Sequence, residues 1–174
     1  KRILKILERK SHRTVMEINL NALIQNLKVY QGFLKPQTRV MAMVKAFGYG
    51  SGAGEVARRL QQQQVDYLSV AYADEGVTLR KAGIHLPIMV MSADEYSFDA
   101  MVNHSLEPEL FSFPILEAFH HYIAQQGLPQ YPIHIKLDTG MHRLGFEPND
   151  INALCELLNQ HHEVSIASVF SHLA

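Results

Sequence analysis

The sequence predicts an α/β protein built on a parallel β-sheet, and three observations lead to that class. The chain has 174 residues, of which 47% are hydrophobic and 19% charged, enough to bury the core of one ordinary domain. Short apolar runs such as residues 39–45 (RVMAMVK) lack a polar face, which is typical of strands buried on both sides. Segments with helical spacing of apolar residues separate these runs. About six such strands fit an open doubly wound sheet or an incomplete (β/α)8 TIM-type barrel, with about six of eight strands.

The first half of the chain alternates between the two periodicities. Residues 13–19 (RTVMEIN) alternate like a strand, and apolar residues then recur at helical spacing from Leu20 to Leu27. Asn19 is placed to cap this helix, and Gly83 stands where a helix-ending glycine is expected. We expect strands at 13–19, 39–45 and 66–71, and helices from residue 20 onward, at 54–64 and at 73–82.

The second half of the chain continues this alternation. Pro87 opens an apolar run, as a proline can near the first position of a strand. The sequence predicts strands at 86–91, 109–112, 133–138 and 164–170, and helices at 98–103, 114–126 and 149–160.

Charge and cysteine content argue against several classes of function. Lys and Arg number 16 and Asp and Glu number 17, a net charge of −1 that disfavours nucleic acid as a partner. No apolar run is long enough to span a bilayer, so we expect no membrane segment. One cysteine, Cys155, excludes an internal disulfide and favours the cytoplasm. Residues 1–13 are strongly basic and are interpreted as a linker or junction before a domain at 14–174.

The first candidate site is the segment MVKAFGYGSG at residues 43–52. Lys45 ends a very apolar strand, where desolvation favours the neutral amine that a Schiff base with a carbonyl cofactor requires. The following Gly48, Gly50 and Gly52 would let backbone amides approach a phosphate beside a helix N-terminus. The alternative is an ordinary surface lysine at the start of a strand-to-helix turn.

The second candidate site is the segment HIKLDTGMHRLGF at residues 134–146. Lys136 and Asp138 are expected to share one face of a strand, because side chains alternate with a period of two. Arg143 follows in a loop at the top of the sheet, which suits recognition of an anion or a phenolate. The alternative is a salt bridge between Arg143 and Asp138 that only holds the turn.

The third candidate is His172 in the segment SHLA. It follows the last predicted strand, at the edge where parallel α/β proteins bind ligands, although a lone histidine there can equally be structural or solvated. The adjacent pairs at residues 120–121 and 161–162 lie on predicted helices and point in different directions. Without cysteine partners or a paired histidine motif, we expect no metal site.

Together these segments resemble the alanine racemase family, which consists of pyridoxal-phosphate enzymes of fold type III. The matching segments occur in the family's order: VMAMVKAFGYGSGAGEVARRL, LSVAYADEGVTLRKAGI, PIMVM, HIKLDTGMHRLGF and SHLA. The resemblance covers residues 14–174. It implies a (β/α)8 barrel followed by a C-terminal β domain, and these residues correspond to the barrel portion alone.

The resemblance also implies a role for each candidate residue. Lys45 matches the lysine that binds pyridoxal 5'-phosphate through a Schiff base and serves as one of two acid/base groups. Tyr49 matches the tyrosine that binds the cofactor phosphate, and His172 matches the histidine packed against the pyridine ring. Arg143 matches the arginine near the cofactor's phenolic oxygen and the substrate carboxylate. Lys136 matches the lysine, often carbamylated, that supports this arginine.

The implied function is interconversion of L-alanine and D-alanine, which supplies D-alanine for peptidoglycan, in a cytoplasmic homodimer. In the family the second base is a tyrosine from the partner subunit's C-terminal domain, so these 174 residues are expected to be inactive by themselves. Some bacteria fuse the racemase behind a cell-wall peptide ligase, and residues 1–13 would then be the junction.

Two alternatives remain within the cofactor class. Another fold-type III racemase or a decarboxylase would share the barrel, although the DTGM-x-RLG segment argues against both. A non-catalytic pyridoxal-phosphate-binding regulator would have a similar length, but the usual lysine context of such proteins differs from KAFGYG.

Overall fold

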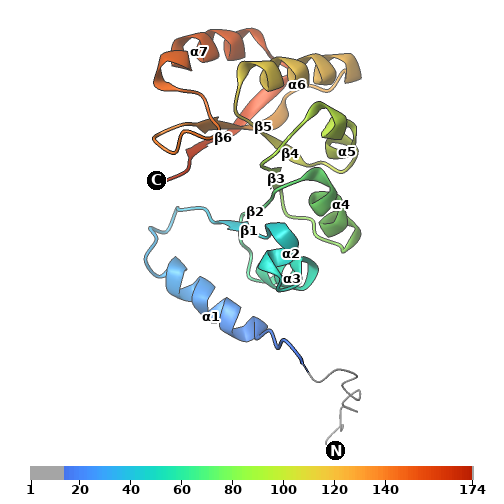
Figure 1. Ribbon diagram of the computed structural model, residues 1–174, viewed down its shortest axis with the longest axis vertical. Helices are drawn as coiled ribbons and strands as arrows, with labels where there is room; N and C mark the ends of the chain where they lie inside the picture. The colour runs from blue at the N-terminus through green and yellow to red at the C-terminus, as the bar shows by residue number, and fades with distance from the viewer. Residues whose placement is uncertain (1–13, 174) are drawn as a thin grey trace, which may run out of the picture.

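The computed structural model describes residues 14–173, which form a six-stranded parallel sheet with helices following one another along one side (Figure 1). The strands are β1 Met41–Met43, β2 Tyr67–Val70, β3 Ile88–Val90, β4 Glu107–Leu110, β5 Tyr131–Leu137 and β6 Val164–Ser171. The helices are α1 Leu20–Gln31, α2 Lys45–Tyr49, α3 Ala53–Gln62, α4 Ala73–Lys81, α5 Phe98–Asn103, α6 Phe113–Gln126 and α7 Ile151–Gln160, with short 3₁₀ turns η1 Glu95–Ser97 and η2 Pro148–Asp150.

The order of the strands decides between the two expected architectures. Each strand pairs in parallel with the next one in the chain, so the spatial order is β1 to β6 without a reversal. A doubly wound sheet needs a point where the order reverses, whereas the wall of a (β/α)8 barrel does not. The expected partial TIM-type barrel with six strands is therefore confirmed.

The two faces of the sheet differ in polarity. Leu68 and Val70 face the helices and belong to the main apolar core, where both are fully buried. Ser69, between them, lies on the inner face of the curved sheet. Glu109 on β4 and Lys136 on the adjacent strand β5 lie on the same face and contact each other. The inner face therefore carries buried polar groups, and each needs a partner on a neighbouring strand.

One inner layer is a closed polar network near the start of the strands. The Tyr67 hydroxyl donates to Glu107 Oε2 at 3.2 Å, and His134 Nε2 lies 2.9 Å from the same oxygen. His134 Nδ1 lies 2.7 Å from Ser168 Oγ, which links β5 to β6. Burial and the neighbouring Glu107 raise the pKa of Tyr67. These groups satisfy one another, so we assign them a structural role.

The helices follow the sequence expectations closely. Asn19 caps α1, and its Oδ1 accepts hydrogen bonds from the N–H groups of Asn21 and Ala22 at 3.0 and 3.1 Å. Helix α1 contacts α3, where Arg59 Nη2 donates to Asn21 Oδ1 at 2.7 Å. Within residues 14–173, no helix combines the length and the apolar character that crossing a membrane requires.

The structure corrects several of the expected strands, and three of the differences have a clear physical reason or matter most for the site. Residues 14–19 form no strand, because a strand requires a partner and this segment pairs with none of the six described here. Strand β4 begins at Glu107, two residues earlier than expected, and β1 is limited to Met41–Met43 because the chain turns at Lys45. The basic segment 1–13 lies outside the described residues.

Candidate active site

Lys45 begins a tight left-handed turn immediately after β1. The φ angles of Ala46, Phe47, Gly48 and Tyr49 are 51°, 57°, 62° and 52°, so four successive residues adopt the left-handed conformation. For a residue with a side chain this conformation costs about 1–2 kcal/mol, and three of the four are not glycine. Lys45 itself is half-buried.

A carboxylate from the next crossover holds this turn in place. Glu75, on α4, accepts a hydrogen bond from the Ala46 N–H through Oε1 at 2.6 Å. Its Oε2 accepts from the N–H groups of Ala71 and Tyr72 at 2.7 and 3.2 Å. One side chain therefore joins the turn after β1 to the segment after β2. This bond offsets part of the strain and positions the residue that follows Lys45.

The glycine amides of the turn are not arranged as the sequence suggested. The N–H groups of Gly48, Gly50 and Gly52 donate to carbonyl groups of the same turn, at 2.9, 3.1 and 3.0 Å. They are therefore engaged and do not form the expected phosphate cradle. Tyr49, in contrast, is 66% exposed and ends the turn that follows β1.

A second loop, residues 138–146, is closed at its base by backbone contacts. The Phe146 N–H donates to the Lys136 carbonyl, and the Asp138 N–H donates to the Phe146 carbonyl, both at 2.9 Å. Gly145 makes this approach possible, because its φ is 130° and a Cβ there would lie 2.5 Å from the Asp138 nitrogen. The loop that carries Arg143 is therefore anchored directly on the end of β5.

Asp138 holds the loop, although not through the salt bridge that the sequence suggested. Its Oδ1 accepts from the N–H groups of Gly140 and His142 at 3.0 and 3.1 Å, and these bonds hold its pKa below the usual range. Its Oδ2 lies 3.4 Å from His142 Nδ1. The turn is thus held through His142, and the exposed Arg143 is left for other partners.

Lys136 pairs with Glu109, a residue that the sequence reasoning missed. Their side chains are 4% and 1% exposed, and Lys136 Nζ lies 3.5 Å from Glu109 Oε1. Burial raises the pKa of Glu109 to about 7, while Lys136, Arg143 and Lys45 act in the opposite direction. The signal was present in the sequence, because Glu107 and Glu109 alternate with apolar residues and therefore share one face of a strand.

The structure brings most of the predicted residues to one edge of the sheet. Lys136, Arg143 and His172 line one narrow cleft with Asp138 at the ends of β5 and β6. Lys45 lies at the same edge, where β1 ends, at the other side of the curved sheet (Figure 1). Lys45 does not line this cleft, although its charge and the charges of Lys136 and Arg143 all lower the pKa of Glu109.

Comparison with known proteins identifies the family to which this architecture belongs. The family model described as alanine racemase, N-terminal domain, matches residues 18–174. The chain belongs to the alanine racemase family. An alanine racemase from Nostoc sp. is 37% identical over 94% of this chain, and a serine/alanine racemase from Enterococcus gallinarum is 37% identical over 92%. The solved alanine racemase of Clostridium difficile 630 superposes over 90% of the chain with a TM-score of 0.84 and 31% identity.

The match covers only part of these relatives. The chain spans 43% of the Nostoc protein, 22% of the Enterococcus gallinarum protein and 42% of the Clostridium difficile chain. Family membership and the barrel fold thus follow directly for the alanine racemase segment described here. The activity of the whole protein is a further step, which we take below.

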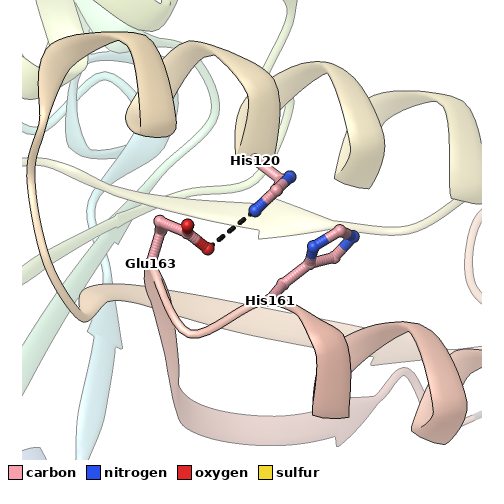
Figure 2. Close-up of side chains that lie close together, drawn as sticks. All are labelled: His120, His161 and Glu163. Carbon is pink, nitrogen blue, oxygen red and sulfur yellow. Dashed lines mark hydrogen bonds and ion pairs between the residues drawn. The ribbon is translucent and has the colours of Figure 1, made fainter.

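One histidine cluster lies away from this edge, between α6 and the start of β6. His120 Nε2 lies 2.8 Å from Glu163 Oε2, and the ring of His161 stacks on that of His120 with 3.4 Å between centroids (Figure 2). These three groups could supply metal ligands, since the ligand atoms lie within 4.8 Å of one another. The two rings are tilted by only 26°, however, so their lone pairs run side by side and do not converge at zinc–nitrogen distance, about 2.1 Å. As arranged, this is a hydrogen-bonded histidine–carboxylate pair with a second imidazole ring stacked on it.

Proposed function

We propose that this chain is the lysine-bearing barrel portion of an alanine racemase, which interconverts L-alanine and D-alanine with pyridoxal phosphate. The observation that carries the proposal is the shared strand edge, where an amine, a phenol, a guanidinium and an imidazole follow the ends of parallel strands in a member of this family. These groups belong to Lys45, Tyr49, Arg143 and His172. A cytoplasmic homodimer that supplies D-alanine for peptidoglycan belongs to the same proposal.

The donor set at this edge fits pyridoxal phosphate. The cofactor has an aldehyde and an anionic phosphate, and the edge offers the half-buried amine of Lys45 and the exposed phenol of Tyr49. The exposed guanidinium of Arg143 suits the phenolic oxygen, and His172 would pack against the pyridine ring. When bound, pyridoxal phosphate supplies a conjugated ring that acidifies the Cα–H bond of an attached amino acid.

The residues of this chain account for proton transfer on one face of the substrate. Lys45 would take the proton from Cα as an amine and return it as an ammonium, which requires its Nζ to stay within hydrogen-bond reach of Cα. The left-handed turn and its bond to Glu75 limit where the backbone of Lys45 can lie. Arg143 binds the substrate carboxylate and orients Cα toward Nζ.

Inversion requires a second acid/base group on the opposite face of Cα. We propose that it comes from residues of the full-length protein beyond the segment described here, supplied by the partner subunit. The relatives that match this chain are more than twice as long, so they have room for such a group. The serine/alanine racemase among them makes serine the first alternative substrate to compare with alanine.

Reductive trapping tests the proposal. The full-length protein is incubated with pyridoxal phosphate, reduced with borohydride and mapped by peptide mass spectrometry, and we expect the label on Lys45. Lys45→Ala should abolish both the label and racemisation of alanine. The matched control Lys81→Ala, on the exposed end of α4, should change neither. A label elsewhere with none on Lys45, or racemisation by Lys45→Ala, contradicts the assignment.

A further inference from the structure

Two imidazoles and one carboxylate meet at the edge of the sheet opposite the candidate active site, where β5 and β6 begin (Figure 2). His120 comes from α6, His161 caps the end of α7, and Glu163 immediately precedes β6. The Tyr131 N–H, at the start of β5, donates to the Glu163 carbonyl oxygen at 2.7 Å. The cluster therefore joins α6 to the end of α7 at the point where the last two described strands begin.

The geometry of the cluster accommodates one charged imidazole but not two. His120 Nε2 lies 2.8 Å from Glu163 Oε2, so a proton on His120 has a carboxylate to bind. The His161 ring lies against the His120 ring, with 3.4 Å between the centroids and 26° between the planes. A charged imidazole needs an acceptor for each of its two N–H groups, yet His161 Nε2 is enclosed without a hydrogen-bond partner among residues 14–173. Two positive rings at this separation would also repel each other.

The charges around the stacked rings favour the same limit. Burial, followed by the charge of His120, lowers the pKa of His161 below its ordinary value of 6.5, although Glu163 and Glu117 act in the opposite direction. Glu117 lies on α6, and His162, the next residue after His161, is exposed, so solvent screens its charge. The hydrogen bond from His120 lowers the pKa of Glu163, so this carboxylate stays ionised while the imidazoles titrate.

We infer that this cluster is a pH-sensitive latch between α6 and the turn that leads into β6. It holds while a single imidazole carries a charge, and it opens when a proton from solvent charges the second one. The His161 ring then leaves the stack, because its N–H groups need water and its neighbour is already positive. The end of α7 and the turn at residues 161–163 detach with it. The inference does not depend on the proposed function, since the three groups lie at the edge opposite the candidate active site.

Histidine titrations in the full-length protein test whether the stack resists a second charge. The protein is labelled with ¹³C-histidine, and its imidazole signals are followed by NMR from about pH 8 to about pH 5. The signal that is missing in His161→Phe belongs to His161, and we expect it to titrate below 6.5 in the wild type. In His120→Gln, which removes the neighbouring charge, the pKa of His161 should rise toward 6.5.

Amide hydrogen exchange, measured by mass spectrometry and corrected for the intrinsic effect of pH, reports the opening itself. Between about pH 7.5 and about pH 5.5, residues 161–166 should lose protection by about tenfold, the factor that corresponds to one pKa unit. His161→Phe keeps a flat ring that can stack but cannot be protonated, so it should lack this pH dependence. The matched control is His121→Phe, which should behave like the wild type. His121 is exposed on the same helix, and its Nε2 lies 2.7 Å from Gln125 Nε2, outside the cluster.

Three results would overturn the inference. A wild-type protein in which every imidazole titrates at or above the ordinary histidine value shows that the stack does not resist a second charge, even if His161→Phe does not fold. The same pH dependence of exchange in His161→Phe and in the wild type shows that another group controls the turn. Stoichiometric binding of Zn²⁺ that abolishes the titration of both His120 and His161 shows a metal centre in place of the latch.

Discussion

Replacing Gly145 with alanine should detach the loop that carries Arg143 from the end of β5. Gly145 has a φ of 130°, and a Cβ built on it would lie 2.5 Å from the nitrogen of Asp138 and 2.6 Å from the carbonyl carbon of Leu137. Both contacts are with backbone, which cannot rotate away as a side-chain end could. The loop must therefore move, and the two hydrogen bonds of Phe146 to the end of β5 must stretch or break.

The loss of stability in Gly145→Ala has two parts, and a control variant in the same loop separates them. Gly140 has nearly the same φ, 136°, but a Cβ there would meet nothing within 4 Å. Gly140→Ala therefore reports backbone strain alone, about 1–3 kcal/mol. Gly145→Ala carries the same strain plus the steric clash, which adds about 1–3 kcal/mol when a packed site is overfilled. We therefore expect Gly145→Ala to lose about 1–3 kcal/mol more unfolding free energy than Gly140→Ala.

Urea unfolding followed by circular dichroism measures both variants against the wild-type full-length protein. A second assay, the KM for alanine, reports the displacement of Arg143 and should rise more in Gly145→Ala than in Gly140→Ala. Equal losses of unfolding free energy in the two variants would refute the steric argument. An unchanged KM in a folded Gly145→Ala protein would show that the loop base does not position Arg143.

Three further predictions concern Glu75, Glu109 and the activity of these residues without the rest of the protein. Glu75→Ala leaves three backbone N–H groups without their acceptor and should lower the unfolding free energy by about 1–3 kcal/mol. Glu75→Gln keeps one carbonyl oxygen and should lose less, so equal losses of the two variants in urea titrations would contradict this prediction. Because the folded-state pKa of Glu109 is raised from 4.5 to about 7, the unfolding free energy should fall by about 3 kcal/mol as pH rises through that window. Unfolding curves of Glu109→Gln at several pH values should lack this fall, and parallel pH profiles of the two proteins would contradict the prediction. The 174 residues alone, supplied with pyridoxal phosphate, should not racemise alanine in a chirality-coupled assay, since a positioned acid/base group contributes about 10²–10⁴-fold to the rate. Activity near that of a full-length relative would show that the second base is unnecessary.

Much of the fold could be predicted because its signals are local. The spacing from Leu20 to Leu27 and the Asn19 cap are properties of neighbouring residues, and α1 begins where they indicate. The apolar runs predicted a parallel sheet with six strands, and strand order then confirmed the barrel wall. Errors of one or two residues arose where a strand end depends on its partner, as at Glu107 in β4. Residues 14–19 alternate like a strand, yet alternation alone supplies no partner.

The candidate site was predictable in part. Lys45, Arg143 and His172 could be placed at strand ends, and all parallel strands end at one edge of a sheet. The sequence could not show that Glu75 binds the turn after Lys45, because 29 residues separate the two hydrogen-bonded positions. The stacking of His161 on His120 was also missed, since the two residues are far apart along the chain and meet only in the folded structure.

The sequence by itself determined the α/β class, the residue types at the strand edge and the segments that carry the family resemblance, because periodicity and short motifs are encoded within a few residues. Only the tertiary structure decided which charges meet. Glu109 becomes the partner of Lys136 through the register of β4 against β5, and Asp138 is withdrawn into its own loop by two backbone N–H groups. Buried charges are satisfied by neighbours in space, and strand register and loop closure choose those neighbours.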